Sequence, residues 1–195
     1  MKEFEITVKV KENLDSVNEK LLRQGFKIIR KSRVEDKYMA NIVDEITADQ
    51  INETLKKCVL IRYLNANGVE YKKITYKKKF YDAGKTLSEE KINVNCDDLN
   101  NAERLFKALN FRNLVDVFYD VIVYERDGLE LAFQNVENLG LLVEYEASGF
   151  SEEITNEEIE NTKKKMYSEI KQFGLELDND LDVRKAYELL KNKLG

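Results

Sequence analysis

The feature of this sequence that most restricts its fold is the alternation of apolar and charged residues along many short segments. The segment from Glu3 to Lys11 shows it first, with Phe4, Ile6, Val8 and Val10 separated by polar residues. Successive side chains of a strand point to opposite faces of the sheet, so this pattern predicts a strand with one apolar and one charged face. Many such strands in one chain predict a polar interior or a polar cleft, which a closed sheet lined with charge would provide.

Comparable segments recur along the chain and are separated by turn or helix signals. Strands are expected over residues 26–29, 34–39, 59–64, 69–77, 91–96, 115–124, 129–136 and 141–146, and a mobile connection over 82–88. The strands are joined mostly by short turns or single helices. The predicted fold is therefore α+β, with a mainly antiparallel closed β-sheet, a tunnel or barrel, and helices packed outside it.

Two amphipathic helices, expected over residues 14–22 and 99–109, indicate an internal repeat. Each ends at a turn residue that a phenylalanine follows, Gly25-Phe26 in the first copy and Asn110-Phe111 in the second. This weak repeat predicts a sheet in two related halves. Further helices are expected after the capping boxes at residues 47–50 and 155–158, the second ending at residue 174, and over 182–194.

The 195 residues fit one domain, 1–195, in which 151–195 form a C-terminal helical part. Hydrophobic residues make up 43% of the chain, enough for a core, yet none of their runs approaches the ~20 residues that cross a bilayer. Without a visible leader, and with only Cys58 and Cys96, the sequence predicts a reduced, cytoplasmic protein without a membrane partner.

Charge and composition exclude several classes of function. A net charge of −5 argues against a nucleic-acid partner. The absence of histidine excludes Ser-His and Cys-His catalysis and histidine-ligated zinc. Any chemistry must then use carboxylates, lysines, arginines, tyrosines and hard metal ions bound through oxygen.

Several short motifs follow one another in an order that is informative as a set. They are Glu3-Phe4-Glu5, Asp36-Lys37-Tyr38, Leu60-Ile61-Arg62, Thr75-Tyr76-Lys77, Leu139-Gly140 with Glu144-Tyr145-Glu146, and Lys185-Ala186-Tyr187 with Leu189-Leu190. In this order the chain resembles the CYTH superfamily, the triphosphate-tunnel fold of class IV adenylate cyclases and thiamine triphosphatases. The last motif resembles the tail of the class IV cyclase branch.

The resemblance implies that a charged tunnel binds a small-molecule triphosphate or nucleotide, with divalent-metal-dependent phosphoryl chemistry of the adenylate cyclase or triphosphate hydrolase type. The implied ligands of Mg²⁺ or Mn²⁺ are Glu3, Glu5, Glu144 and Glu146. The resemblance implies Arg62 and Lys77 as catalytic and substrate-binding residues. Lys9, which would substitute for the motif lysine replaced by Thr7, and Lys73 are further candidates for substrate binding. Without the resemblance, Glu3 and Glu5 fit a solvated strand face equally well, and Lys77 fits a solvated lysine run.

The sequence departs from the family's motifs at several charged positions. Thr7, Leu60, Tyr119 and Val121 stand where the family carries lysine or arginine, and Gln134 stands where it carries a metal-binding aspartate. Each missing close cation would remove on the order of 1–3 kcal/mol of charge-assisted hydrogen bonding to a triphosphate.

Three functions remain open from the sequence. The first is the metal-dependent enzyme, which needs replacement cations from Lys72, Lys73 or Lys78. The second is a catalytically degenerate module that binds a nucleotide or a less anionic ligand without turnover. The third is a structural interaction domain whose charged strands face solvent. Homodimer formation stays open in each case.

Overall fold

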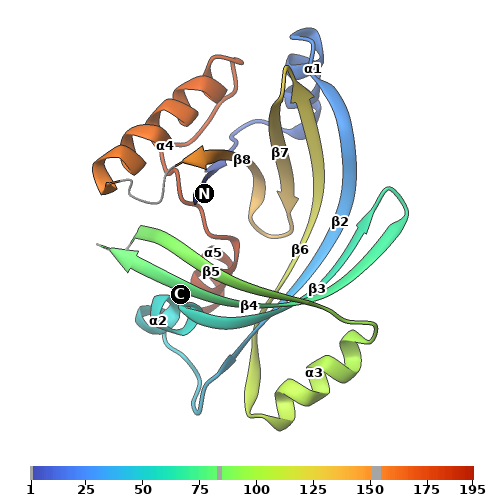
Figure 1. Ribbon diagram of the computed structural model, residues 1–195, viewed down its shortest axis with the longest axis vertical. Helices are drawn as coiled ribbons and strands as arrows, with labels where there is room; N and C mark the ends of the chain where they lie inside the picture. Colours follow the sequence, from blue (N-terminus) through green and yellow to red (C-terminus); the bar gives the residue numbers. More distant parts are fainter. Residues whose placement is uncertain (1, 83–84, 151–154) are drawn as a thin grey trace. The chain divides into compact units, whose positions relative to one another are not determined.

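The computed structural model describes residues 2–82, 85–150 and 155–195. Within these residues eight strands form one sheet in the order β1-β8-β7-β6-β2-β3-β4-β5, and the α+β prediction is confirmed (Figure 1). The strands are β1 (Lys2–Lys9), β2 (Lys27–Asn41), β3 (Lys57–Ala66), β4 (Val69–Asp82), β5 (Lys85–Asn95), β6 (Phe111–Arg126), β7 (Leu129–Val136) and β8 (Gly140–Phe150). The helices are α1 (Leu14–Arg23), α2 (Ile51–Leu55), α3 (Leu99–Ala108), α4 (Asn156–Lys171) and α5 (Lys185–Leu194), with a 3-10 turn at Ala48–Gln50.

Among the boundaries that differ from the sequence prediction, two concern the continuity of strands. The segments 26–29 and 34–39 fall in one continuous strand, β2, which begins at Lys27, because the polar residues between them take part in the sheet as exposed or half-buried strand positions. Residues 85–88, expected in a connection, begin β5, which pairs with β4 from Lys73↔Asn95 to Asp82↔Lys85. Residues 83–84 of that predicted connection lie outside the described residues. None of the helices in the described part of the chain is both long and apolar enough to cross a membrane.

The predicted closure of the sheet is not confirmed. Strands β1 and β5 stand at the two ends of the hydrogen-bonded order, and no pairing joins them within residues 2–82, 85–150 and 155–195. The registers given for β1–β8, β7–β8, β2–β3, β3–β4 and β4–β5 are all antiparallel. The antiparallel part of the prediction is thus confirmed, whereas closure would require the two end strands to exchange hydrogen bonds.

The chain divides into two compact units, each assembled from separate segments. Unit 1 comprises Met1–Lys31, Asp120–Val136 and Gly140–Val183, and unit 2 comprises Ser32–Tyr119, Glu137–Leu139 and Arg184–Gly195. Each unit has a hydrophobic cluster on one face of its strands, so the opposite strand face is available for polar residues.

In unit 1 the core lies between the apolar faces of β1, β7 and β8 and the helices α1 and α4. Ile6 and Val8 of β1 and Phe133 of β7 are at most 1% exposed, and Ile170 of α4 packs in the same cluster. The alternation seen in the sequence therefore sets the orientation of β1: its apolar residues face this core and Glu5, Thr7 and Lys9 face the other way.

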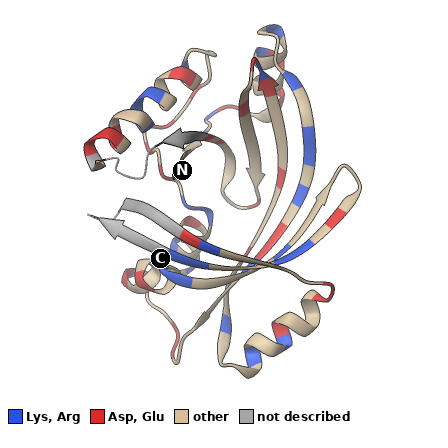
Figure 2. Ribbon diagram, viewed as in Figure 1, with Lys and Arg blue, Asp and Glu red and all other residues tan. Residues whose placement is uncertain are grey.

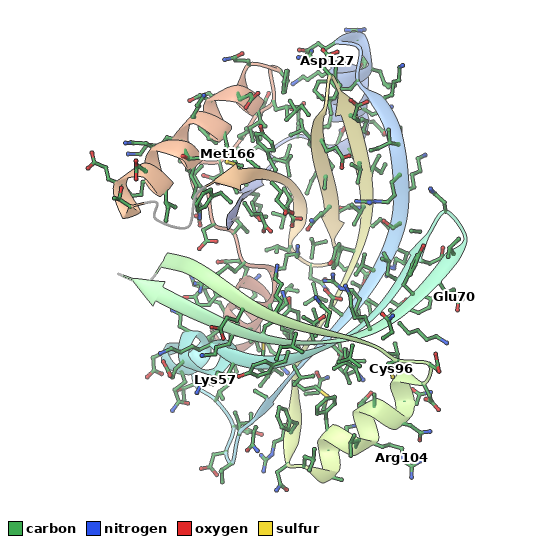
Figure 3. The ribbon with its side chains drawn as sticks, viewed as in Figure 1. Lys57, Glu70, Cys96, Arg104, Asp127 and Met166 are labelled. Carbon is green, nitrogen blue, oxygen red and sulfur yellow. The ribbon has the colours of Figure 1, made fainter. Side chains whose placement is uncertain are left out.

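In unit 2 the apolar faces of β2, β3 and β4 pack against α3 (Figure 1). Met39, Val59 and Ile61 form the buried centre of this cluster, and Phe106 of α3 packs against it. Arg104 points away from the sheet on the outer side of α3 (Figure 3). The core face of β3 thus carries residues 59 and 61, and the other face carries Leu60 and Arg62.

The predicted repeat is confirmed in its local structure. The N-cap side chain accepts a hydrogen bond from the third following residue in both helices, through Asn13 in α1 and Asp98 in α3. Both helices then end in a left-handed residue, Gly25 with φ +85° and Asn110 with φ +64°. Glycine and asparagine are the residues that adopt this conformation most readily, which is why the two copies share it.

Candidate functional site

Unit 1 carries a polar sheet face, which we call the acidic face. Antiparallel pairing places Glu5 of β1 directly opposite Glu146 of β8, and Thr7 directly opposite Glu144. Ile6 and Val8, which alternate with Glu5 and Thr7 along β1, point into the core. The side chains of Glu5, Thr7, Glu144 and Glu146 therefore lie on the opposite face of the sheet. Lys9, two residues beyond Thr7, lies on the same face and is exposed. Gln134 of β7 belongs to it as well, through its bond to Glu144 described below.

The pair Glu5 and Glu146 is unusual for a sheet, because like charges directly opposite one another are destabilising. A cation between them would offset this repulsion, and carboxylate oxygens are the ligands that Mg²⁺ prefers. No group of three or more acidic or cysteine residues close enough to hold a metal ion is found among the side chains that the structure describes. Two carboxylates still fit Mg²⁺, which proteins usually hold through one or two carboxylates together with substrate phosphates.

Two neutral residues of the acidic face hold its carboxylates. The Thr7 hydroxyl donates to Glu5 Oε1 at 3.1 Å, and the Gln134 amide donates to Glu144 Oε2 at 2.7 Å. Thr7 is 6% exposed and Gln134 is 4% exposed. These are two of the positions where the sequence departs from the family's motifs, so a neutral donor here orients a carboxylate where a charged residue was expected.

Unit 2 carries the second polar sheet face, which we call the basic face. Arg62 of β3 lies directly opposite Lys73 of β4, and Lys77 of β4 lies directly opposite Lys91 of β5. Thr75 lies between the two lysines of β4 and donates to the Asn93 side chain at 2.8 Å. Figure 2 shows the positively charged stretches of β4 within unit 2.

Lys72, Lys73 and Lys78, the lysines considered as replacements for missing cations, lie on different faces of β4. Lys73 shares the basic face with Arg62. Lys72 and Lys78 point to the other face, where Lys78 pairs with Glu90 at 3.3 Å and Lys72 donates to the Asp97 carbonyl at 3.5 Å. Lys91 was not among the predicted site residues, because nothing in its local sequence indicates that it would stand opposite Lys77.

Arg62 is held by a cluster of polar side chains in unit 2. Its Nε and one Nη donate to the two oxygens of Asp36, each at 2.6 Å, and the same Nη donates to the Tyr119 hydroxyl at 3.1 Å. That hydroxyl in turn donates to Asp36 at 3.1 Å. The ammonium group of Lys185 lies 4.9 Å from the centre of the Tyr119 ring, which places the C-terminal motif beside this cluster.

The electrostatics of this cluster limit what Arg62 can do. The Asp36 side chain is fully buried, and Tyr119 is 4% exposed. Burial alone would lower the pKa of Arg62, but the hydrogen bonds and the charge of Asp36 outweigh it and raise the pKa. Arg62 is thus permanently charged and fixed in orientation, while part of its charge is balanced by Asp36.

The structure therefore gathers the predicted site residues into two sets. Glu5, Glu144, Glu146 and Lys9 lie on the acidic face, and Arg62, Lys73 and Lys77 lie on the basic face. The side chain of Glu3, the remaining predicted metal ligand, lies outside the described residues. Both cysteines are free thiols, with Cys58 buried.

No family model matches the sequence. A relative from Methanocaldococcus jannaschii, named "Putative adenylate cyclase MJ0240", is 30% identical over 96% of this chain and 97% of its own length. The chain belongs to the CYTH superfamily, with the class IV adenylate cyclase fold. The order of motifs along this CYTH chain agrees with that membership.

Solved structures support the CYTH fold. The protein PH1819 from Pyrococcus horikoshii OT3 superposes with a TM-score of 0.73 at 23% identity, covering 98% of this chain and 99% of its own. A protein from Hippeastrum, described as an adenylyl cyclase candidate with a dominant triphosphatase activity, superposes with a TM-score of 0.62 at 13% identity. That comparison covers 98% of this chain and 96% of the Hippeastrum protein. At these identities the likeness concerns the fold.

Proposed function

We propose that this CYTH protein binds a triphosphate or nucleotide together with a divalent metal ion. The observation that carries the proposal is the placement of two like-charged pairs directly opposite one another, Lys77 with Lys91 and Glu5 with Glu146. The lysine pair suits the binding of phosphate, and the glutamate pair suits the binding of a divalent cation.

The basic face would hold the phosphates. Lys73, Lys77 and Lys91 are point charges on flexible stems, and Arg62 adds a planar donor in a fixed orientation. Lys73 and Lys77 are four positions apart on one strand and stand about 14 Å apart at the backbone, so their flexible side chains would approach a phosphate chain from its two ends. In phosphoryl transfer, catalysis consists largely of such positioning and charge stabilisation.

The acidic face would hold Mg²⁺ or Mn²⁺. Glu5 and Glu146 are the ligands proposed here, with Glu144 and Glu3 as the further members that the family resemblance implies. When bound, the metal would neutralise phosphate charge and so assist attack at phosphorus. Thr7 would keep Glu5, and Gln134 would keep Glu144, in the orientation in which each accepts the metal or a metal-bound water.

The closed sheet implied by the resemblance is part of this proposal. A closed sheet of this kind would have an interior lined with charged side chains. The adenylate cyclase-like and triphosphatase reactions differ in the nucleophile, a ribose hydroxyl or water, and the residues described here fit either one.

Binding without turnover is the second candidate, and the Asp36–Arg62 pair favours it. An arginine whose charge is balanced by a buried carboxylate contributes less to holding a triphosphate than a solitary arginine would. The neutral residues Thr7 and Tyr119 likewise remove positive charges that would hold a triphosphate, and Gln134 removes a carboxylate that would hold the metal. A nucleotide or less anionic ligand would then be held without the charge stabilisation that its transfer reaction needs.

Isothermal titration of the protein with tripolyphosphate, in the presence of Mg²⁺ or Mn²⁺, tests the proposal. Removing one charge-assisted contact costs about 1.5–3 kcal/mol, so Lys77→Ala and Lys91→Ala should each weaken binding by roughly 10- to 100-fold. Lys78→Ala is the matched control, since its side chain lies on the other face of the same strand, and should leave the affinity unchanged.

The metal arm uses Glu5→Gln and Glu146→Gln. Each variant should abolish the dependence of triphosphate binding on Mg²⁺ while retaining weak binding without metal.

Equal effects of Lys77→Ala and Lys78→Ala on tripolyphosphate affinity would contradict the assignment of the basic face. Release of phosphate or formation of a cyclic nucleotide by the wild-type protein separates the enzyme from the module that binds without turnover.

A further inference from the structure

The hairpin that joins β3 to β4 in unit 2 carries an exposed apolar patch. Tyr71 lies directly opposite Leu64, and Val69 lies directly opposite Ala66. Tyr71 is 52% exposed and Val69 is 53% exposed, while their two partners are half-buried. Figure 3 labels Glu70, which stands between the two exposed residues near the turn of this hairpin.

The patch continues the basic face. Alternation along β4 puts Val69, Tyr71, Lys73, Thr75 and Lys77 on one face of the strand. The hydrophobic cluster of unit 2 lies on the opposite face, where Ile74 packs. The patch therefore does not belong to that core.

The reverse side of the hairpin is polar. Tyr63 and Glu70 lie there, and the Tyr63 hydroxyl donates to the Glu70 carboxylate at 2.8 Å. Exposed apolar patches that are rimmed by polar residues mark ligand-binding or partner sites. The two tyrosines of this hairpin thus differ: one has a polar partner, and the other presents its ring on the lysine face.

We propose that Tyr71 and its apolar neighbours form a stacking platform for a planar ring system attached to the phosphates, such as a nucleobase. This rests on the proposed function, and it specifies the ligand as one that carries a ring beyond its phosphate chain. Tyr71 stands two residues before Lys73, about 7 Å along the strand, so a ring on Tyr71 places the attached phosphate beside Lys73 and Arg62. An aromatic ring stacks on any base, because every base has a π-face.

The chemistry of stacking determines which substitutions matter. Base–aromatic stacking is sequence-tolerant, and its loss on substitution by alanine weakens binding roughly 5- to 100-fold. The phenol oxygen is not required, so Tyr71→Phe should bind as the wild type does. Inorganic tripolyphosphate has no ring, so its affinity should not depend on Tyr71.

The test is isothermal titration of wild type, Tyr71→Ala, Tyr71→Phe and Tyr63→Ala with ATP and with tripolyphosphate, each with Mg²⁺. We expect Tyr71→Ala to weaken ATP binding roughly 5- to 100-fold and tripolyphosphate binding less than about twofold. Tyr63→Ala, on the reverse side of the same hairpin, is the matched control and should change neither affinity.

Three results would overturn the platform. If Tyr71→Ala leaves ATP binding unchanged while wild type binds both ligands, the platform is refuted and the proposed function stands. If Tyr71→Ala weakens both ligands equally, the residue acts on the fold or on the phosphates, and the platform is refuted. If wild type binds neither ligand, the proposed function is refuted together with the inference that rests on it.

Discussion

Substitutions at the Asp36–Arg62 pair should show how much of the protein's free energy of unfolding depends on this buried ion pair. Arg62→Ala would leave the fully buried Asp36 carboxylate without its bidentate partner, and such losses cost about 3–5 kcal/mol. Asp36→Ala would leave Arg62, whose side chain is 28% exposed and can be partly hydrated, so a smaller cost of about 2–4 kcal/mol is expected. The double variant removes both charges, and its cost should fall below the sum of the two by about 2 kcal/mol.

Urea unfolding followed by circular dichroism measures these free energies, with the slope checked for constancy across variants. Glu35→Ala is the matched control, because Glu35 is the exposed neighbour of Asp36 on the same strand, and it should change stability by less than about 0.5 kcal/mol. Costs of Asp36→Ala and Arg62→Ala that add within about 0.5 kcal/mol would refute the reasoning, since independent residues show that behaviour.

Two further predictions concern unit 1. Burial alone would raise the pKa of Glu12, but hydrogen bonds from Lys20, Ser16 and the Glu176 amide outweigh it and lower the pKa below its ordinary value. The carboxylate therefore stabilises the fold above its unfolded-state pKa and loses that contribution as the pH falls through the lowered pKa of the folded state. The difference in unfolding free energy between wild type and Glu12→Gln should accordingly shrink on acidification, and a pH-independent difference would contradict this. Thr155→Ala should cost about 1 kcal/mol, because the Thr155 side chain caps α4, and a melting temperature unchanged within error would argue against the cap.

Local chemistry explains why much of the fold could be predicted. The strict alternation around Ile6 and Val8 was enough to place Glu5 and Thr7 on the face away from the core. The left-handed end of α1 followed from Gly25, since glycine tolerates positive φ. The continuity of strands was harder to predict. The sequence predicted two strands in place of β2, because polar residues interrupt the hydrophobic pattern there. Backbone pairing does not depend on that pattern and continues through them.

By itself, the sequence determined which side chains share one face of one strand, and hence the separate groups of acidic and basic candidates. Only the tertiary structure decided which residues of different strands meet. Lys77 stands opposite Lys91, and Tyr119 bonds to Asp36, 83 positions away in the chain. Strand register arises from pairing between distant segments, and a shift of a single residue reverses every side chain, so no local pattern specifies these contacts.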